Sequence, residues 1–257
     1  MPVCTSLIAQ HIRRRVAAGA VIPLAGGLLL GAVGVAGAAA SPATPATSAA
    51  AGLAVPAGST LVATLHGTTR KYASAGGRAT GSIPGTYFGI RSVLPVIATD
   101  PGWLRVRLAQ RPDGSTAWIK ASAATLNTTP YRIVINTDNM HLTLYKSGRR
   151  VFSAAAGIGT TGDPTPLGDF FVAFIEAPPR PNPGYGPFIM VTSAHSNAIG
   201  NWEASGDAVI GIHGPLGDDR LIGTRGAHIS HGCIRLHRSA QNRLRDIPAG
   251  TPINIER

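Results

Sequence analysis

The sequence predicts a mainly β protein in which a small β-barrel precedes a larger β-rich domain with one or few short helices. Short runs rich in β-branched and aromatic residues recur along the chain, and turns containing Gly or Pro separate them. A single segment near the C-terminus has a helical apolar period. A change of composition near Leu126 to Pro130 divides about two hundred residues into two parts, each long enough to bury a core.

The first 40 residues have the pattern of a secretory signal. Arg13 to Arg15 form a basic block, and residues 16–40 carry no charge and end in small residues suited to cleavage after Ala38 or Ala40. An uncleaved membrane anchor is the alternative, because about 20 apolar residues suffice to cross a bilayer. A cleaved leader would take Cys4 with it. We therefore expect an exported protein of the periplasm or cell wall, which contacts a membrane only if the leader is retained.

Residues 41–58 consist almost wholly of Ala, Pro, Ser, Thr and Gly, which predicts a disordered linker. Residues 59–127 follow, with strands expected at Leu61–Leu65, Ser92–Ile97, Trp103–Leu108 and Thr116–Ile119. Many short strands without a helical period indicate a small barrel. The strands that carry Trp103 and Trp118 resemble the end of a bacterial SH3-like domain, which would imply a wall-associated module. Because large aromatic side chains are most often core, we expect both tryptophans inside the barrel.

Residues 130–257 form the second predicted domain. Its strands are expected at Tyr131–Asn136, His141–Tyr145, Val151–Ala154, Asp169–Ile175, Phe188–Thr192, Ala208–Ile212 and Thr251–Ile255. One helix is predicted at Ser239–Asp246, where Ser239 can cap the first turn and Pro248 stops the last. Its apolar positions are Ala240, Leu244 and Ile247.

One thiol stands out among the candidate functional groups. Cys233 is the only cysteine that remains once the leader is cleaved, so the mature chain offers it no disulfide partner. An ordinary thiol has a pKa of about 8.5, and a neighbouring imidazolium can lower this to about 3.5–7.5. His231 would lie on the same side of an extended strand as Cys233, whereas His213 would reach it if residues 214–229 form a loop. The backbone around Gly232 could also direct N–H groups at a developing oxyanion.

The remaining histidines suggest a metal site as the competing interpretation. His228, His231, Cys233 and His237 are all types of zinc ligand, but structural zinc usually uses two pairs of ligands and only one cysteine is present here. We therefore expect no metal and no cofactor. Solvated or locally hydrogen-bonded side chains are expected for His66, His141, His195, His228 and His237.

The charge of the chain favours an anionic partner. The formal net charge is +11, and removal of Arg13, Arg14 and Arg15 with the leader would leave +8. Nucleic-acid binding would require clustered basic residues or stacking aromatics, whereas the arginines here are dispersed and aromatics are few. We expect no nucleic-acid partner, and an anionic cell wall is the more natural one.

Three segments together resemble the L,D-transpeptidase family with a YkuD-type catalytic domain. The first combines His213-Gly214 with Ser230-His231-Gly232-Cys233-Ile234-Arg235-Leu236, and sixteen residues, 214–229, separate His213 from Ser230. The second is Thr165-Pro166-Leu167-Gly168-Asp169-Phe170, and the third is the ending Gly250-Thr251-Pro252-Ile253. The resemblance covers about half the chain and implies a β-rich catalytic domain.

By position, the resemblance implies that Cys233 is the nucleophile and His213 its general base and acid. The carbonyl of Gly214 would orient the imidazole of His213.

The resemblance also implies a set of groups around the nucleophile. The backbone amides of His231, Gly232 and Cys233 would form the oxyanion hole, and Ser230 and His231 would line the substrate site. Arg235 would hold a substrate carboxylate through its planar fork. The alternative for Arg235 is an ordinary ion pair.

The implied reaction is acyl transfer between peptidoglycan stem peptides, with a thioester on Cys233 and a 3→3 cross-link as product. The stem peptides would serve as donor and acceptor, and carbapenems would acylate the same thiol. Water as acceptor would make the enzyme an L,D-carboxypeptidase. A non-catalytic wall-binding protein is the alternative from another class, and the presence of both His213 and Cys233 argues against it.

Overall fold

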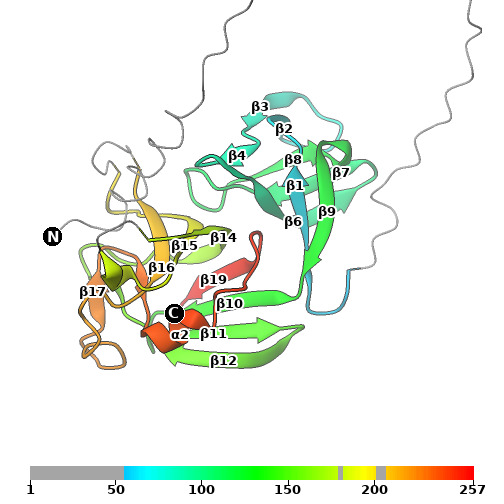
Figure 1. Ribbon diagram of the computed structural model, residues 1–257. Helices are drawn as coiled ribbons and strands as arrows, with labels where there is room; N and C mark the ends of the chain where they lie inside the picture. Colours follow the sequence, from blue (N-terminus) through cyan, green and yellow to red (C-terminus); the bar gives the residue numbers. More distant parts are fainter. Residues whose placement is uncertain (1–54, 179–181, 201–206) are drawn as a thin grey trace, which may run out of the picture.

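A computed structural model of the protein describes residues 55–178, 182–200 and 207–257 (Figure 1). The predicted leader, residues 1–40, lies outside the described residues, and so do residues 41–54 of the predicted linker. The described chain contains a seven-stranded and an eight-stranded sheet with very little helix, so the predicted mainly β fold is confirmed. Among the described residues, no helix has both the length and the apolar character that crossing a membrane requires.

The seven-stranded sheet has the spatial order β3-β2-β8-β7-β6-β1-β9. Its strands are β1 (Thr60–Leu65), β2 (Thr69–Tyr72), β3 (Ala79–Ile83), β6 (Val93–Asp100), β7 (Trp103–Arg107), β8 (Thr116–Lys120) and β9 (Ala124–Thr129). The short strands β4 (Thr86–Tyr87) and β5 (Ile90–Arg91) form a separate hairpin, and the 3₁₀ helix η1 spans Ala121–Ala123. The four strands expected from sequence correspond to β1, β6, β7 and β8. The SH3-like assignment of this sheet stays a prediction.

The expectation that Trp103 and Trp118 fill the core of this sheet is wrong. Both are half-buried, and their cross-strand partners on the same face are Lys120 and Arg105. Trp103 packs edge-on against Tyr72, with ring centroids 4.8 Å apart. The buried residues of β7 and β8 alternate with these positions and are Leu104, Val106, Ala117 and Ile119. The aromatic pair therefore lies on the outer face of the sheet.

The eight-stranded sheet has the order β12-β11-β10-β19-β14-β15-β16-β18. Its strands are β10 (Tyr131–Asn136), β11 (His141–Lys146), β12 (Arg149–Ala155), β14 (Gly168–Glu176), β15 (Ile189–His195), β16 (Val209–His213), β18 (Ile234–Arg235) and β19 (Pro252–Glu256). A two-stranded sheet pairs β13 (Ile158–Gly159) with β17 (His228–Ser230), and the 3₁₀ helix η2 spans Pro183–Tyr185. All seven strands expected for the second domain are present in this sheet.

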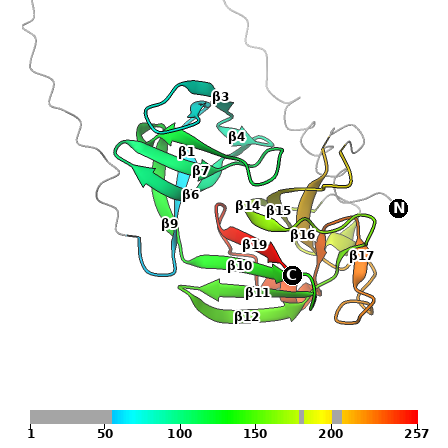
Figure 2. The ribbon, with the colours of Figure 1, turned by 180° about the vertical axis from the view of Figure 1, so that it is seen from behind.

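The two faces of the β14–β15–β16 layer bury different sets of side chains. One face packs into the main core together with residues of β10, β11, β19 and helix α2 (Arg238–Asn242). From this layer the main core includes Phe170, Val172, Met190, Ile210 and Ile212. The other face contributes to a second cluster with Ala173, Phe174, Tyr185, Ile189, Val191, Val209 and Cys233. Figure 2 shows this layer beside β10–β12 from behind. The thiol thus lies on the face turned away from the main core.

The predicted helix is shorter than expected. Helix α2 spans Arg238–Asn242, and its N-cap residue is His237, not Ser239. The chain then continues in hydrogen-bonded turns, in which Leu244 N–H donates to the carbonyl of Gln241 at 2.9 Å. The expected apolar positions are nevertheless buried: Ala240, Leu244 and Ile247 all belong to the main core. Core packing therefore follows the apolar period although the regular helix ends early.

The two large sheets share buried residues at their junction. Phe171 belongs to β14 of the second sheet, is 1% exposed, and packs in the core of the first sheet with Leu65, Leu94 and Leu104. An ion pair between Arg107 and Asp169, 3.1 Å long, crosses the same junction. The side chain of Phe171 thus links the two cores directly.

We expect Phe171→Ala to lower the free energy of unfolding by about 3–5 kcal/mol, the usual cost of removing a buried phenyl ring. Phe152→Ala is the matched control, because Phe152 is only partly buried at the edge of the main core. Urea denaturation followed by circular dichroism measures both variants. A cost for Phe171→Ala no larger than that for Phe152→Ala would contradict this account of the junction.

Candidate active site

The parallel pairing of β16 with β18 brings the two predicted catalytic residues together. Its register places Ile212 opposite Ile234 and His213 opposite Arg235. The carbonyl of His213 accepts a hydrogen bond from Leu236 N–H at 2.9 Å. The strand that ends in His213 is thereby fixed beside the segment that follows Cys233.

The same register puts the thiol and the imidazole on one face of the sheet. Cys233 precedes Ile234 and therefore lies opposite Gly211, whose N–H donates to the Cys233 Sγ at 3.4 Å. His213 is two residues beyond Gly211, so its side chain leaves the same face. Gly211 places no side chain between the two groups. Cys233 is 5% exposed and His213 is fully buried.

The ring of His213 is held by its neighbour. Its Nδ1 lies 2.7 Å from the carbonyl oxygen of Gly214. A carbonyl only accepts, so this contact assigns the proton to Nδ1 and leaves the Nε2 lone pair as acceptor in the neutral ring. The Nε2 atom is buried and has no hydrogen-bond partner among the described residues. The neutral imidazole thus keeps Nε2 as a buried hydrogen-bond acceptor without a partner among the described residues.

Tyr185 is a neighbour of His213 that the sequence motifs do not assign. The two rings pack edge to face, with centroids 4.8 Å apart, and Tyr185 is fully buried. The carbonyl of Tyr185 accepts hydrogen bonds from Gly214 N–H at 2.8 Å and from the Gln241 side-chain amide at 2.9 Å. The η2 segment therefore fixes the position of the imidazole ring by direct packing.

Ser230 shapes the loop before the nucleophile. Its hydroxyl donates to the carbonyl of Cys233 at 2.5 Å and accepts from Gly232 N–H at 3.1 Å. The carbonyl of Gly232 in turn accepts from the hydroxyl of Thr165 at 2.8 Å. Gly232 has φ 111°, a conformation that favours glycine. Three buried hydrogen bonds thus hold the turn that presents Cys233.

This turn changes two expectations from sequence. β17 ends at Ser230, so His231 and Cys233 do not share an extended strand, and the His231 side chain is 46% exposed with its Nε2 3.6 Å from Asp163. The N–H of Gly232 donates to Ser230 instead of pointing at a vacant oxyanion position. The backbone amides of His231 and Cys233 remain as the predicted donors to the oxyanion. The hydroxyl of Ser230 stabilises the loop through its hydrogen bonds to Gly232 and Cys233.

Arg235 pairs with a carboxylate of its own chain. Its Nη1 donates to Asp218, and its backbone exchanges two hydrogen bonds with Gly157, each 2.8 Å long. The side chain is 13% exposed. This ion pair is the alternative that the sequence left open for Arg235.

The other histidines divide into two groups. His228 bonds through Nδ1 to the carbonyl of Gly159 at 3.1 Å, and His237 lies 3.6 Å from Asp219. The expectation of a solvated or locally bonded side chain is wrong for His195, which is 1% exposed and bound to Asp113, 82 positions away in sequence. No group of three His, Cys, Asp or Glu side chains within residues 55–178, 182–200 and 207–257 could hold a metal ion.

Comparisons with known proteins identify the family. Residues 130–255 match the YkuD family model, described as an L,D-transpeptidase catalytic domain. A Bacillus licheniformis protein described as an L,D-transpeptidase, YkuD, is 32% identical over 130 residues, which cover 50% of this chain and 67% of the relative. The chain therefore belongs to the YkuD family of L,D-transpeptidases.

Solved structures of L,D-transpeptidases are also similar to this chain. A crystal structure of a cysteine-to-serine mutant of the Enterococcus faecium L,D-transpeptidase has 22% identity and a TM-score of 0.37, covering 49% of each chain. L,D-transpeptidase 3 from Mycobacterium tuberculosis, in complex with a faropenem-derived adduct, has 14% identity and a TM-score of 0.42. That match covers 65% of this chain and 91% of the mycobacterial one. The matched part spans about half the length of the enterococcal chain.

We expect Ser230→Ala to destabilise the protein by about 1–3 kcal/mol, because two buried backbone groups lose their partner. The rate at which Cys233 reacts with iodoacetamide should change as well, since the turn before it loosens. Ser153→Ala, at an exposed serine that bonds Thr143, is the control. Unchanged stability and unchanged thiol reactivity in Ser230→Ala would refute the structural role of this hydroxyl.

Proposed function

We propose that the protein is an exported peptidoglycan L,D-transpeptidase that forms 3→3 cross-links through a thioester on Cys233. Membership of the YkuD family supports the class of reaction. The observation that carries the assignment of residues is the placement of Cys233 and His213 on one face of the sheet. The Nε2 of His213 is unbonded among the described residues, while its Nδ1 is fixed by Gly214.

The first half-reaction begins with transfer of the thiol proton from Cys233 to the Nε2 of His213. The thiolate attacks the carbonyl that joins the third residue of a tetrapeptide stem, a diamino acid, to the terminal D-alanine. The C–N bond then breaks, His213 returns the proton to the departing amine, and D-alanine leaves. A thioester remains on Cys233, so one difficult step becomes two easier ones.

The tetrahedral intermediate carries a negative charge on the former carbonyl oxygen. We assign its stabilisation to the backbone amides of His231 and Cys233, because the amide of Gly232 already donates to Ser230. Each such donor is worth about 2.7–4 kcal/mol in acyl-transfer enzymes. The turn at Gly232 thus positions the two flanking amides that stabilise the oxyanion.

The second half-reaction consumes the thioester. The side-chain amine of the diamino acid on a neighbouring stem attacks the thioester carbonyl, His213 accepts the proton from this amine, and the thiol of Cys233 is released. Water in place of the amine would give a tripeptide and make the enzyme an L,D-carboxypeptidase. Both reactions share the same acyl-enzyme, so the acceptor alone separates them.

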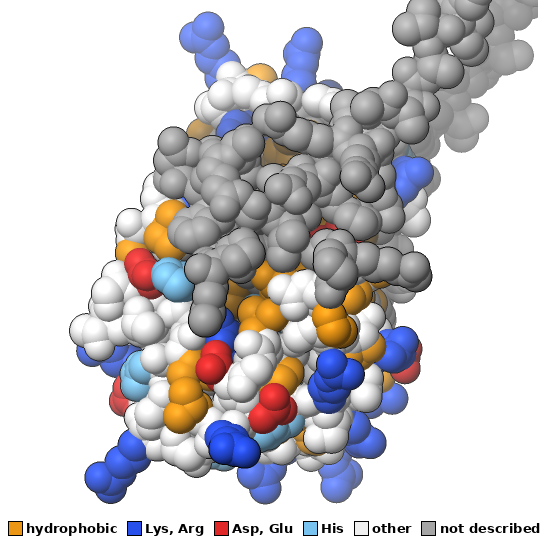
Figure 3. Space-filling model, turned by 60° about the vertical axis from the view of Figure 1, so that its left-hand side comes forward, with side chains coloured by type: hydrophobic (Ala, Val, Ile, Leu, Met, Phe, Trp, Pro, Cys, Tyr) orange, Lys and Arg blue, Asp and Glu red, His pale blue; other side chains and the backbone are white. Residues whose placement is uncertain are grey.

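The cell wall is the proposed location and partner. The N-terminal 40 residues have the pattern of an export signal, and the chain has 23 Lys and Arg against 12 Asp and Glu. Lys and Arg side chains project around the edge of the face shown in Figure 3. Such a surface suits association with the anionic polymers of a wall. Carbapenems are proposed as covalent inhibitors, because the thiol that attacks a stem peptide can also open a β-lactam ring.

Intact-protein mass spectrometry after incubation with a disaccharide tetrapeptide tests this function. We expect an adduct equal to the substrate minus D-alanine, no adduct in Cys233→Ala, and formation slowed about 10²–10⁴-fold in His213→Ala, which lacks the general base. Soluble products identify the acceptor, since a dimer indicates transpeptidation and a tripeptide indicates hydrolysis. Adduct formation by Cys233→Ala would refute the assignment of the nucleophile.

A further inference from the structure

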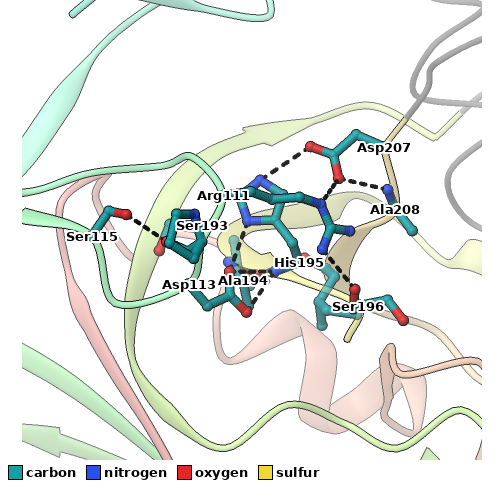
Figure 4. Close-up of polar contacts among 12 residues, drawn as sticks. Arg111, Asp113, Ser115, Ser193, Ala194, His195, Ser196, Asp207 and Ala208 are labelled. Carbon is teal, nitrogen blue, oxygen red and sulfur yellow. Dashed lines mark hydrogen bonds and ion pairs between the residues drawn. The ribbon is translucent and has the colours of Figure 1, made fainter. Parts of the chain in front are cut away.

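Four ionisable side chains meet where the two sheets join. Arg111 and Asp113 lie between β7 and β8 of the first sheet, His195 ends β15, and Asp207 precedes β16. Figure 4 shows the imidazole of His195 between the carboxylates of Asp113 and Asp207, with Arg111 beside them. We call these four residues the junction clasp.

His195 is the centre of the clasp. Its Nδ1 lies 2.8 Å from Asp113 and its Nε2 lies 3.3 Å from Asp207. The same Asp113 carboxylate accepts the backbone N–H of His195 at 3.1 Å and 3.2 Å from its two oxygens. Because His195 is 1% exposed, losing Asp113 would leave a buried backbone donor and a buried ring nitrogen without this partner.

Arg111 binds the chain that leaves β15. Its Nε lies 2.7 Å from Asp207, its Nη1 donates to the carbonyl of Ser196 at 2.9 Å, and its Nη2 donates to the carbonyl of Ile199 at 3.1 Å. One guanidinium thus contacts both ends of the connection between β15 and β16. A rigid planar fork is suited to holding several acceptors in one arrangement.

Tyr87, in the separate β4–β5 hairpin, interacts electrostatically with the same two carboxylates. Burial raises the pKa of the Tyr87 phenol, the carboxylates of Asp207 and Asp113 raise it further, and Arg111 lowers it. The phenol is therefore neutral near pH 7, and the guanidinium of Arg111 is the clasp cation beside the two carboxylates.

The clasped connection leads directly to the catalytic pair. His195 is opposite Val209, the first residue of β16, and Ser196 N–H donates to the carbonyl of Ala208 at 2.7 Å. The pairing of β15 with β16 shifts register between Val191 and His195, so the regular ladder is interrupted there. Four residues after Val209, the same strand ends in His213.

We propose that Arg111 and Asp113 are positioning residues for catalysis: through His195 and Asp207 they hold β16 in the register that places Gly211 and His213 beside Cys233. The first sheet is then required for the geometry of the catalytic residues, and does not act only as a spacer. The inference rests on the proposed function only in taking Cys233 as the nucleophile.

The test measures the rate at which Cys233 is alkylated by iodoacetamide in the folded full chain, read by mass spectrometry of the peptide that carries Cys233. This readout needs no peptidoglycan, so it stays informative if the proposed reaction is wrong. The variants are Arg111→Ala and Asp113→Ala, with Asp113→Asn as the conservative variant that retains an acceptor for the His195 N–H. Arg107→Ala is the matched control, because it breaks another ion pair across the same junction, to Asp169 on β14.

We expect Arg111→Ala and Asp113→Ala to slow alkylation at pH 7 by about tenfold or more, since small displacements of a catalytic pair are costly. Asp113→Asn should recover part of the rate, and Arg107→Ala should stay within about twofold of the wild type. Wild-type alkylation rates and an unchanged pH profile in Arg111→Ala and Asp113→Ala would overturn the proposal. If the alanine variants do not fold, the same result in a folded Asp113→Asn would overturn it. Equal slowing in Arg107→Ala would overturn it too, because any weakening of the junction would then suffice.

Discussion

The candidate site depends on the short parallel pairing of β16 with β18. Two strand residues on each side define it, yet it fixes which residues of two distant segments face each other. With Ile212 opposite Ile234, the thiol of Cys233 lies beside the bare backbone of Gly211, and His213 emerges on the same face. The alternating pleat sends the isoleucines into the main core and the reactive groups to the other side. Burial of the isoleucines therefore holds the register that places Cys233 and His213 on one face.

Support for this pairing comes from parts of the chain that are remote in sequence. Thr165 and Ser230 hold the turn at Gly232, Tyr185 packs on the imidazole, and the junction clasp holds the far end of β16. Phe171 joins the cores of the two sheets, so the first sheet cannot separate from the second without exposing a buried phenyl ring. The segments on either side of the imidazole are thus held by contacts from distant parts of the described chain.

Much of the fold and the motif residues could be predicted from sequence, because strand alternation and short motifs are local. The face that each strand buries was harder to assign: Arg105, two residues after Trp103, shares its face and could have signalled an exposed surface. The Gly232 N–H donates to the Ser230 hydroxyl because of a local turn, and the spacing of residues in the motif did not predict this turn. The burial and pairing of His195 could not be predicted for a different reason. Its partner Asp113 is 82 positions away in sequence, and only the packing of the two sheets brings them together.

The pH dependence of Cys233 alkylation in the wild type and in His213→Gln shows whether the thiol and the imidazole interact. If the imidazole of His213 and the thiol form a reactive pair, the wild-type rate should persist to pH 7 and below. The His213→Gln rate should then fall about tenfold per pH unit below about 8.5, the ordinary pKa of a thiol. Coinciding profiles for the two folded proteins would show that His213 does not act on the Cys233 thiol.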